Sequence, residues 1–281
     1  MKHLFIFVAV TLVATMFSGC NRKTQDNNWQ TLFNGSDLTG WDTYVGPTYD
    51  TIQNKFDTLL VPGLNNDPRK IFSVTNEDGE PAIRISGDGF GGISTLQEFE
   101  NYHLRVEFKW GDLRWPPRKD KKRDSGILYH ATGPQGAGSG FWLRSQECQV
   151  QEGDCGDYWS VDKAIVDIPA VGEKIEAYVY DPKGEMHPFS TYGSSYGPRC
   201  IKNPDAEKPV GEWNVVDIFC LGGNSIHMIN GTVVMKLFNS RQPMDGKEIP
   251  LTKGKIQIQT EGAEIFYRNI QVEPITELPK E

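Results

Sequence analysis

Alternation of apolar and polar residues with a period of two is the feature that most constrains this chain. In residues 102–110, the apolar Leu104, Val106 and Phe108 alternate with charged residues. Successive side chains of a strand point to opposite faces, so this pattern predicts a strand with one buried face and one wet face. Helical periodicity is nearly absent. Further strand-like runs fall at residues 70–75, 81–86, 92–96, 126–131, 147–151, 175–180, 213–221, 225–229, 232–237, 255–260 and 264–272.

The connections between these runs indicate how the strands assemble. Asn230-Gly231 separates two runs by two residues, which predicts a hairpin with a type I′ turn. No linker or repeat divides the chain, so we expect one domain over residues 29–275, followed by a tail at residues 276–281. A dozen short strands predict an all-β fold, a jelly-roll-like sandwich of two antiparallel sheets. Long loops are expected at residues 110–124, 131–141 and 182–209, where they would form binding rims.

The charge balance narrows the class of ligand. The chain has 281 residues, of which 37 are acidic and 29 basic, giving a formal net charge of −8. Phosphate backbones require a basic face, and no basic stripe is present, so nucleic acid is not expected as a partner. Hydrophobic residues make up 38% of the chain, which is enough to build a core.

The first residues have the pattern of an export signal. Lys2 precedes an apolar run that is short for a permanent membrane span, and Ser18-Gly19-Cys20 resembles the lipobox of bacterial lipoproteins. This predicts a signal peptide at residues 1–19, lipidation of Cys20, and a polar tether at residues 20–28. The protein would be exported and anchored by lipid to the cell envelope, and Asn21 favours the bacterial outer membrane. An ordinary secretory signal with a coincidental cysteine is the alternative.

Four further cysteines would lie in a compartment that permits disulfides. Cys148 and Cys220 alternate with apolar neighbours, which indicates buried thiols. Cys155 and Cys200 fall in loops rich in Gly, Pro and Asp, and are therefore the pair expected to form a disulfide. No Cys-x-x-Cys spacing supports zinc, and no metal ligands are predicted.

Two runs carry long polar side chains on one face. The period of two places Glu147 and Gln149 together with Gln151, and it places Gln257 and Gln259 together with Glu261. Rows of amide and carboxylate groups suit a sugar, which offers many hydroxyl groups. An ordinary solvated sheet face is the alternative. A carbohydrate cleft is further favoured by Arg144, by the acidic cluster at residues 152–159, and by aromatic residues in or beside the long loops: Trp115, Trp142, Tyr158, Trp159, Tyr192 and Tyr196.

Several short motifs, in their order and spacing, resemble the 3-keto-disaccharide hydrolase family. The matching segments are Leu32-Phe33-Asn34-Gly35, Leu38-Thr39-Gly40-Trp41, Asp124-Ser125-Gly126-Ile127, Glu147-Cys148-Gln149, Gly211-Glu212-Trp213-Asn214, Asn230-Gly231 and Tyr267-Arg268-Asn269-Ile270. The resemblance covers essentially the whole expected domain and implies a sandwich of the concanavalin A-like lectin/glucanase type. One departure is Asp124, because the family more often has Asn before Ser-Gly.

The resemblance implies a sugar that is already oxidised at C3. A ketone at C3 acidifies the C2 proton, so a base can remove it, the C1 substituent leaves, and water adds to give net hydrolysis. Glu147 is the first candidate for the base and His130 the second, and Glu152 is a possible acid. The candidate substrate-binding residues are Asp124, Tyr129, Trp142, Arg144, Gln149, Asp154, Trp159, Gln257, Gln259 and Glu261.

The sequence leaves two other functions open. Glu147-x-Gln149-x-x-Glu152 resembles the strand of laminarinase-type retaining glycosidases, in which a bulge returns the second Glu to the cleft. A non-catalytic sugar-binding lipoprotein is the other alternative. No cofactor is required, although a divalent cation such as calcium is compatible with the Asp-rich loops. The expected partners are a carbohydrate substrate and a neighbouring sugar oxidoreductase or transporter, with membrane contact only through the lipid.

Overall fold

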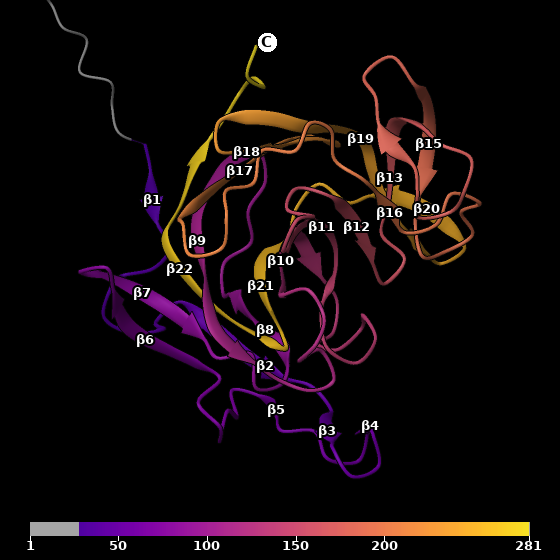
Figure 1. Cartoon of the computed structure of the whole chain (residues 1–281). Helices are drawn as coiled ribbons and strands as arrows, with labels where there is room; N and C mark the ends of the chain where they lie inside the picture. Colours follow the sequence, from indigo (N-terminus) through magenta and orange to yellow (C-terminus); the bar gives the residue numbers. More distant parts are fainter. Residues whose placement is uncertain (1–27, 281) are drawn as a thin grey trace, which may run out of the picture.

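Two large antiparallel sheets pack face to face in the computed structural model, which describes residues 28–280 (Figure 1). The predicted all-β sandwich is confirmed, and the described residues contain no helix. The predicted signal peptide, Cys20 and all of the tether except Asn28 lie outside the described residues. The strands are β1 Gln30–Thr31, β2 Trp41–Val45, β3 Thr48–Asp50, β4 Lys55–Asp57, β5 Gly63–Leu64, β6 Phe72–Glu77, β7 Glu80–Ile85, β8 Phe90–Thr95, β9 Tyr102–Arg114, β10 Asp124–Thr132, β11 Arg144–Gln151, β12 Tyr158–Val161, β13 Ile165–Val171, β14 Val179–Tyr180, β15 Glu185–Phe189, β16 Arg199–Cys200, β17 Asn214–Leu221, β18 Asn224–Ile229, β19 Thr232–Met244, β20 Lys247–Pro250, β21 Lys255–Glu261 and β22 Ala263–Pro274.

The strand order of each sheet shows how distant parts of the chain meet. The larger sheet runs β14-β13-β19-β18-β17-β9-β22-β7-β6, and the second sheet runs β16-β12-β11-β10-β21-β8-β2-β5. In the second sheet, β21 lies between β8 and β10, so a strand near the end of the chain completes a layer built mainly from its first half (Figure 1).

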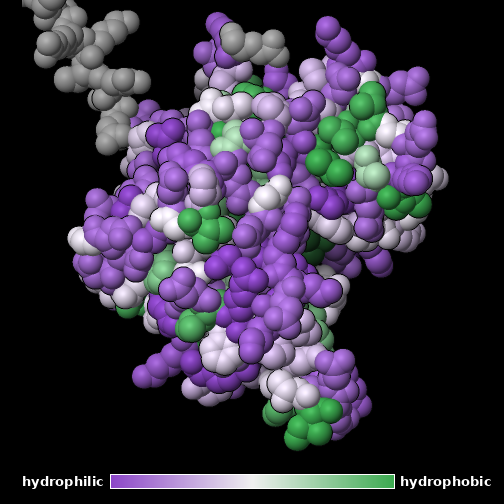
Figure 2. Space-filling view, in the orientation of Figure 1, coloured by the Kyte–Doolittle hydropathy of each residue, from purple (hydrophilic) through white to green (hydrophobic). Residues whose placement is uncertain are grey.

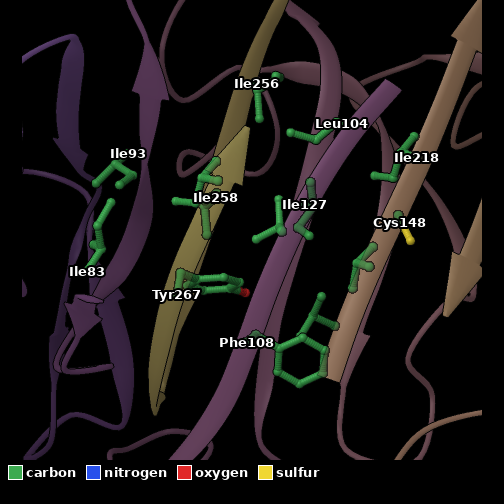
Figure 3. Packing of buried hydrophobic residues seen from close by; sticks show 14 of the residues in the cluster. Ile83, Ile93, Leu104, Phe108, Ile127, Cys148, Ile218, Ile256, Ile258 and Tyr267 are labelled. Carbon is green, nitrogen blue, oxygen red and sulfur yellow. The ribbon is translucent and has the colours of Figure 1, made fainter. Parts of the chain in front are cut away.

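The main core fills the space between the two sheets. Ile127 and Ile258 come from the second sheet, and Phe108 and Ile218 come from the larger one, and all four are fully buried (Figure 3). Each of these side chains lies on the inward face of a strand whose alternate residues point outward. The two-residue alternation therefore determines both the core and what the outer faces present.

Most predicted strands are present, but their bounds and number differ. Asn230 and Gly231 have φ values of 49° and 80° between β18 and β19, as a type I′ hairpin requires. In the predicted strand at residues 175–180, only the last two residues form a strand, β14, because the rest of the segment is an exposed turn region. The expected loop at residues 182–209 contains β15 and β16.

A lobe beside the second sheet has its own small core. It includes β13, β15 and β20, which Figure 1 places around the far end of β19. Val166, Ile168 and Phe189 pack there with Leu237 of β19. The segment that connects β15 to β16 belongs to this lobe and reaches the outer face of the second sheet.

Apolar side chains are also exposed at the hairpin of β3 and β4. Ile52 is 94% exposed and Leu59 is 95% exposed. Figure 2 shows this apolar tip at the lower end of a mainly hydrophilic face. Among the described residues, no helix is long and apolar enough to cross a membrane.

The expected disulfide between Cys155 and Cys200 is wrong. All four described cysteines are buried free thiols, as was predicted for Cys148 and Cys220. Cys155 packs into the core between the sheets, whereas Cys200 packs into the core of the lobe. Their loop-like sequence context hid the fact that both side chains point into apolar layers.

We therefore predict that a reductant leaves the melting temperature of the folded protein unchanged. Burial raises the pKa of Cys148 and of Cys155 well above the ordinary value for a thiol, so native alkylation should also be slow. Mass spectrometry after unfolding in iodoacetamide without reductant should find all four thiols alkylated. A species two hydrogens lighter, with a melting temperature that falls on reduction, would contradict the free-thiol state.

Candidate active site

The outer face of the second sheet carries both predicted rows of polar side chains. In β11, Cys148 lies opposite Ile127 of β10 and faces the core, so its neighbours Glu147 and Gln149 face outward. In β21, Ile258 also lies opposite Ile127. The same alternation therefore sends Gln257, Gln259 and Glu261 to the outer face, next to the row from β11.

A cleft of about 480 Å³ lies over this face. Its volume falls within the range of about 300–1,000 Å³ that is common for small-molecule sites. The floor comes from strands, and the walls come from the loops around residues 118, 138, 162 and 192. The polar and aromatic residues lining the cleft include Arg118, Asp124, Trp142, Glu147, Gln149, Gln151, Trp159, Ser160, Asp162, Lys163, Thr191, Tyr192, Gln259 and Glu261.

Gly126 leaves the gap in which two functional side chains meet. A Cβ atom at this position would collide with Oε1 of Glu147 and with Oε1 of Gln259. Gly126 is on β10, opposite Gln149 of β11, so the missing side chain opens the centre of the floor. The glycine thus allows side chains from β11 and β21 to reach over the intervening strand.

Glu147 is a carboxyl group without a partner in this floor. It is 4% exposed, and among residues 28–280 it forms neither a hydrogen bond nor an ion pair. Burial, together with the negative charge of Asp124, raises the pKa of Glu147 well above its usual range. The group therefore binds a proton more strongly than an ordinary glutamate, as a general base requires.

Asp124 and Glu261 share one cation, Arg118. The Arg118 guanidinium forms an ion pair with Oδ2 of Asp124 and lies 3.4 Å from Oε1 of Glu261. Burial raises the pKa of Asp124 to about 7, although the positive charge of Arg118 acts to lower it. Burial, together with the negative charge of Asp124, also raises the pKa of Glu261. Gln151 donates a hydrogen bond of 2.5 Å to Oδ2 of Asp124. Near neutral pH this group therefore holds at least part of a proton.

Three buried acceptor atoms of the floor have no partner in the described structure. They are Oδ1 of Asp124, Oε1 of Gln149 and Oε1 of Gln259. Buried polar groups in folded proteins are nearly always hydrogen-bonded, so unpartnered atoms gathered in one cleft indicate a place for a polar ligand. Sugar hydroxyl groups have suitable donors and acceptors.

Two predicted site residues face the core and not the cleft. Tyr129 lies two residues from Ile127, on the same inward face, and its hydroxyl group contacts Ser225 at 2.8 Å and His227 at 3.1 Å. His130 has a φ of 52° within a register shift that turns its side chain into a buried position against Tyr102 and Tyr129. Burial lowers the pKa of His130 to about 4. The structure therefore removes His130 as the second candidate base.

The remaining predicted residues outside the cleft have partners elsewhere. Arg144 holds Asp162 at 2.9 Å and thereby supports the cleft wall. Glu152 forms an ion pair with Arg123 at 3.0 Å, and Asp154 forms one with Lys122 at 2.7 Å. Gln257 is fully buried and accepts a hydrogen bond of 2.9 Å from the backbone N–H of Leu143.

The position of Glu152 bears on the retaining alternative. A retaining glycosidase needs its two carboxyl groups about 5–5.5 Å apart across the scissile bond. Glu152 does not line the cleft with Glu147, because Arg123 and Arg114 hold its carboxylate outside it. The pair that the sequence pattern suggested is not assembled.

Among the expected rim aromatics, Trp142, Trp159 and Tyr192 line the cleft. Trp115 and Tyr158 serve the fold instead, since Trp115 donates a hydrogen bond to Ser86 and Tyr158 is buried in the lobe. Tyr196 stacks on His187.

Sequence reasoning missed Arg118 and the turn at residues 162–163. Arg118 falls in a loop with several other basic residues, and no local pattern distinguishes the one that folds over the floor. Asp162 and Lys163 follow a strand that the sequence did not predict. The described residues contain no cluster of three or more His, Cys, Asp or Glu side chains arranged to hold a metal ion.

A family model for the 3-keto-alpha-glucoside-1,2-lyase-like domain matches residues 28–273. The chain belongs to this family. The resemblance drawn from the sequence motifs is thereby confirmed, and the chain is a carbohydrate-active protein. No curated protein sequence matches the chain.

Solved structures similar to this chain include a candidate glycosyl hydrolase from Parabacteroides distasonis. It has 19% sequence identity and a TM-score of 0.46, over 89% of this chain and 100% of the other. The carbohydrate-binding module CBM66 from Bacillus subtilis has 9% identity and a TM-score of 0.44, over 84% of this chain and 96% of the other.

We predict that ionisation of Asp124 makes a destabilising contribution that grows as the pH rises from about 4 to 7. Asp124 has a pKa of about 7 in the folded state, above the value of about 3.9 for an unfolded chain, so folding is favoured while the carboxyl group keeps its proton. The stabilisation lost through this group is at most about 4 kcal/mol. Asp124→Asn cannot ionise, so the difference between its free energy of unfolding and that of the wild type, measured by chemical denaturation, should shift in favour of the variant as the pH rises from about 4 to 7.

Asp88→Asn provides the control, because Asp88 pairs with Arg69 away from the cleft. This variant should keep the pH dependence of the wild type. Equal slopes for Asp124→Asn and the wild type would show that Asp124 is ionised throughout this pH range.

Proposed function

We propose that this protein cleaves glycosides whose sugar is oxidised to a ketone at C3. Glu147 removes the C2 proton, the C2–H electron pair forms the enolate with the C3 oxygen, and the C1–O bond then breaks to release the leaving group. Addition of water across the C1–C2 double bond places hydroxyl on C1 and hydrogen on C2, so the net reaction is hydrolysis. Family membership supports this chemistry.

The observation that carries the proposal is the unpartnered carboxyl group of Glu147 in the floor of the cleft. A C–H bond of an ordinary sugar is far too weak an acid for a carboxylate, but a neighbouring ketone makes proton removal feasible. Burial raises the pKa of Glu147, which brings its basicity closer to that task. The elimination needs one base and not a pair of carboxylates, in agreement with the position of Glu152.

Arg118 supplies the positive charge that an enolate requires. It lies at the end of the floor that is formed by Asp124 of β10 and Glu261 of β21. The space above Gly126, over which the Glu147 side chain leans, is next to this end. We assign the C3 oxygen to this end, where the guanidinium and the protonated form of Asp124 donate hydrogen bonds as negative charge develops. The proton that Glu147 has accepted is then available to the leaving oxygen.

The anchoring of the protein is a separate proposal, supported by its sequence pattern alone. We propose export through the signal at residues 1–19 and lipidation of Cys20, which would hold the domain at the cell envelope, in the bacterial outer membrane. The substrate would be supplied by an enzyme that oxidises the C3 hydroxyl group of a glycoside, because the proposed elimination cannot start without that ketone.

Glu147→Gln should lower kcat/KM on a 3-keto-glucoside by about 10²–10⁴-fold, because the amide keeps the shape of the side chain but cannot accept the proton. Binding of the substrate should persist in calorimetry. Release of the leaving group is measured for the 3-keto-glucoside and for its unoxidised parent. Only the 3-keto-glucoside should be cleaved. Deuterium at C2 should be lost to solvent during turnover.

Glu152→Gln makes the same chemical change outside the cleft and should retain the rate. Equal rates on the oxidised and unoxidised sugars, with a loss in both variants, would point to a retaining glycosidase. Binding without turnover on either sugar would identify a lectin.

Arg118→Met should reduce kcat by about 10²–10³-fold with a smaller change in KM, because the enolate is charged and the ground-state ketone is not. Arg123→Met removes a guanidinium from the same loop, which pairs with Glu152 outside the cleft, and should leave kcat near the wild-type value. Steady-state kinetics on the 3-keto-glucoside compares the two variants. Similar kcat values for both would exclude Arg118 from enolate stabilisation.

A further inference from the structure

Lys163 occupies a fixed place on the wall of the cleft. It follows β12 in a turn where Asp162 and Lys163 have φ values of 43° and 68°. Arg144 holds this turn through the backbone oxygen of Asp162 at 2.7 Å and through its carboxylate. The backbone N–H of Lys163 donates to the hydroxyl oxygen of Thr191 at 2.9 Å, so the turn is tied to the lobe.

The Lys163 ammonium group has no acidic partner among residues 28–280. Its described contact is the ring of Tyr192, whose centroid lies 5.6 Å from Nζ. The other cation lining the cleft, Arg118, is paired with Asp124 and Glu261 at the end assigned to the C3 oxygen. Lys163 is therefore the cationic wall residue that remains free to pair with a negative ligand group.

The register of the strands places Lys163 at the opposite end of the cleft from Arg118. Along β11, Gln151 lies opposite Asp124, and the backbone of Glu147 lies four residues away, about 13 Å along the strand. The carboxyl group of Glu147 leans back over Gly126 and is therefore closer to the Arg118 end than its backbone is. Trp159 of β12 lies opposite Glu147, and the chain continues from there toward Lys163. The order along the cleft is thus Arg118, Glu147 and Lys163.

This order gives the bound sugar a direction. In a pyranose ring, C2 lies between C1 and C3. If the C3 oxygen is at Arg118 and C2 is at Glu147, the substituent on C1 points toward Lys163. Tyr192, which is 54% exposed, and the half-buried Trp159 border this region and offer aromatic faces to a planar or ring-shaped group.

We propose that Lys163 and Tyr192 form a leaving-group subsite for glycosides whose leaving group bears an anionic substituent such as a carboxylate. The assignment of this end to the leaving group rests on the proposed function. The Lys163 ammonium pairs with the anion, while the neighbouring aromatic side chains contact the body of the leaving group. Exposure of Lys163 limits the gain to a modest factor, which falls as the salt concentration rises.

The test compares the binding of phenyl and 4-carboxyphenyl glucopyranosides by calorimetry at low salt, each as the α and the β anomer. These unoxidised sugars are not turned over in the proposed reaction, so the measurement is independent of elimination. We expect the carboxylated glycoside of the anomer that binds to have a Kd about fivefold lower than its phenyl counterpart. Lys163→Met should bring the ratio of Kd values to about one, and Lys163→Glu should invert it, with the Kd of the phenyl glycoside little changed.

Lys183→Met is the matched control, because Lys183 is an exposed lysine of the same lobe outside the cleft lining. It should keep the wild-type ratio. A wild-type ratio of one, a preference that survives in Lys163→Met, or an equal loss in Lys183→Met would overturn the subsite. Absence of binding by both glycosides would overturn it as well.

The two proposals fail in different assays. Cleavage of a 3-keto-glucoside with no carboxylate preference in binding would leave the proposed function standing and remove the subsite. A carboxylate preference that depends on Lys163, without cleavage of the 3-keto-glucoside, would support the anion subsite and remove the elimination reaction.

Discussion

The contact between Arg118 and Asp124 controls the charge of the whole floor. Asp124, Glu147 and Glu261 lie together in a cleft where burial disfavours ionised carboxyl groups, and one guanidinium opposes them. Full ionisation would leave two uncompensated negative charges at the edge of the core. The floor therefore keeps part of its protons near neutral pH, so an ionised carboxylate can act as a base while a protonated carboxyl group beside it donates a hydrogen bond.

Strand alternation joins this chemistry to the stability of the fold. Cys148 and Val150 of β11 are buried in the core, and the residues between and beside them, Glu147 and Gln149, form the floor. The same holds for Ile258 and Gln259 in β21. A floor supported in this way cannot shift its side chains without disturbing the packed layer beneath it, which keeps the unpartnered acceptors in place for a ligand.

The sequence was sufficient to predict those parts of the site that follow from this alternation. Glu147, Gln149 and Gln259 were placed correctly on an outer face because their strands are regular. Tyr129 was misplaced although it shares the parity of the buried Ile127, and His130 was misplaced because a register shift with a positive φ interrupts the alternation there. Both errors concern the end of β10.

Contacts that depend on loops had no comparable local signal. Arg118 reaches the floor because its loop folds back over the sheet, with Trp115 bonded to the backbone of Gly262 at 2.8 Å. Cys155 and Cys200 were expected to pair because both lie in loop-like sequence, but the burial of each side chain is determined by a different apolar layer. Such placements depend on the packing of segments far apart in the chain, which a single sequence does not reveal.

Gln149 explains why this floor suits the removal of a proton from carbon better than a double displacement. The retaining pattern has an acid at this position, between its two glutamates, whereas here the side chain is a neutral amide. The pKa of Glu147 is then raised by burial and by Asp124, with no ionised group between Glu147 and Gln151. The second glutamate of the pattern, Glu152, is committed to two arginines outside the cleft. The centre of the floor therefore holds one basic carboxylate, which faces the space above Gly126, and the guanidinium of Arg118 lies beside it. Formation of an enolate requires these two groups: a base for the proton and a positive charge for the oxygen.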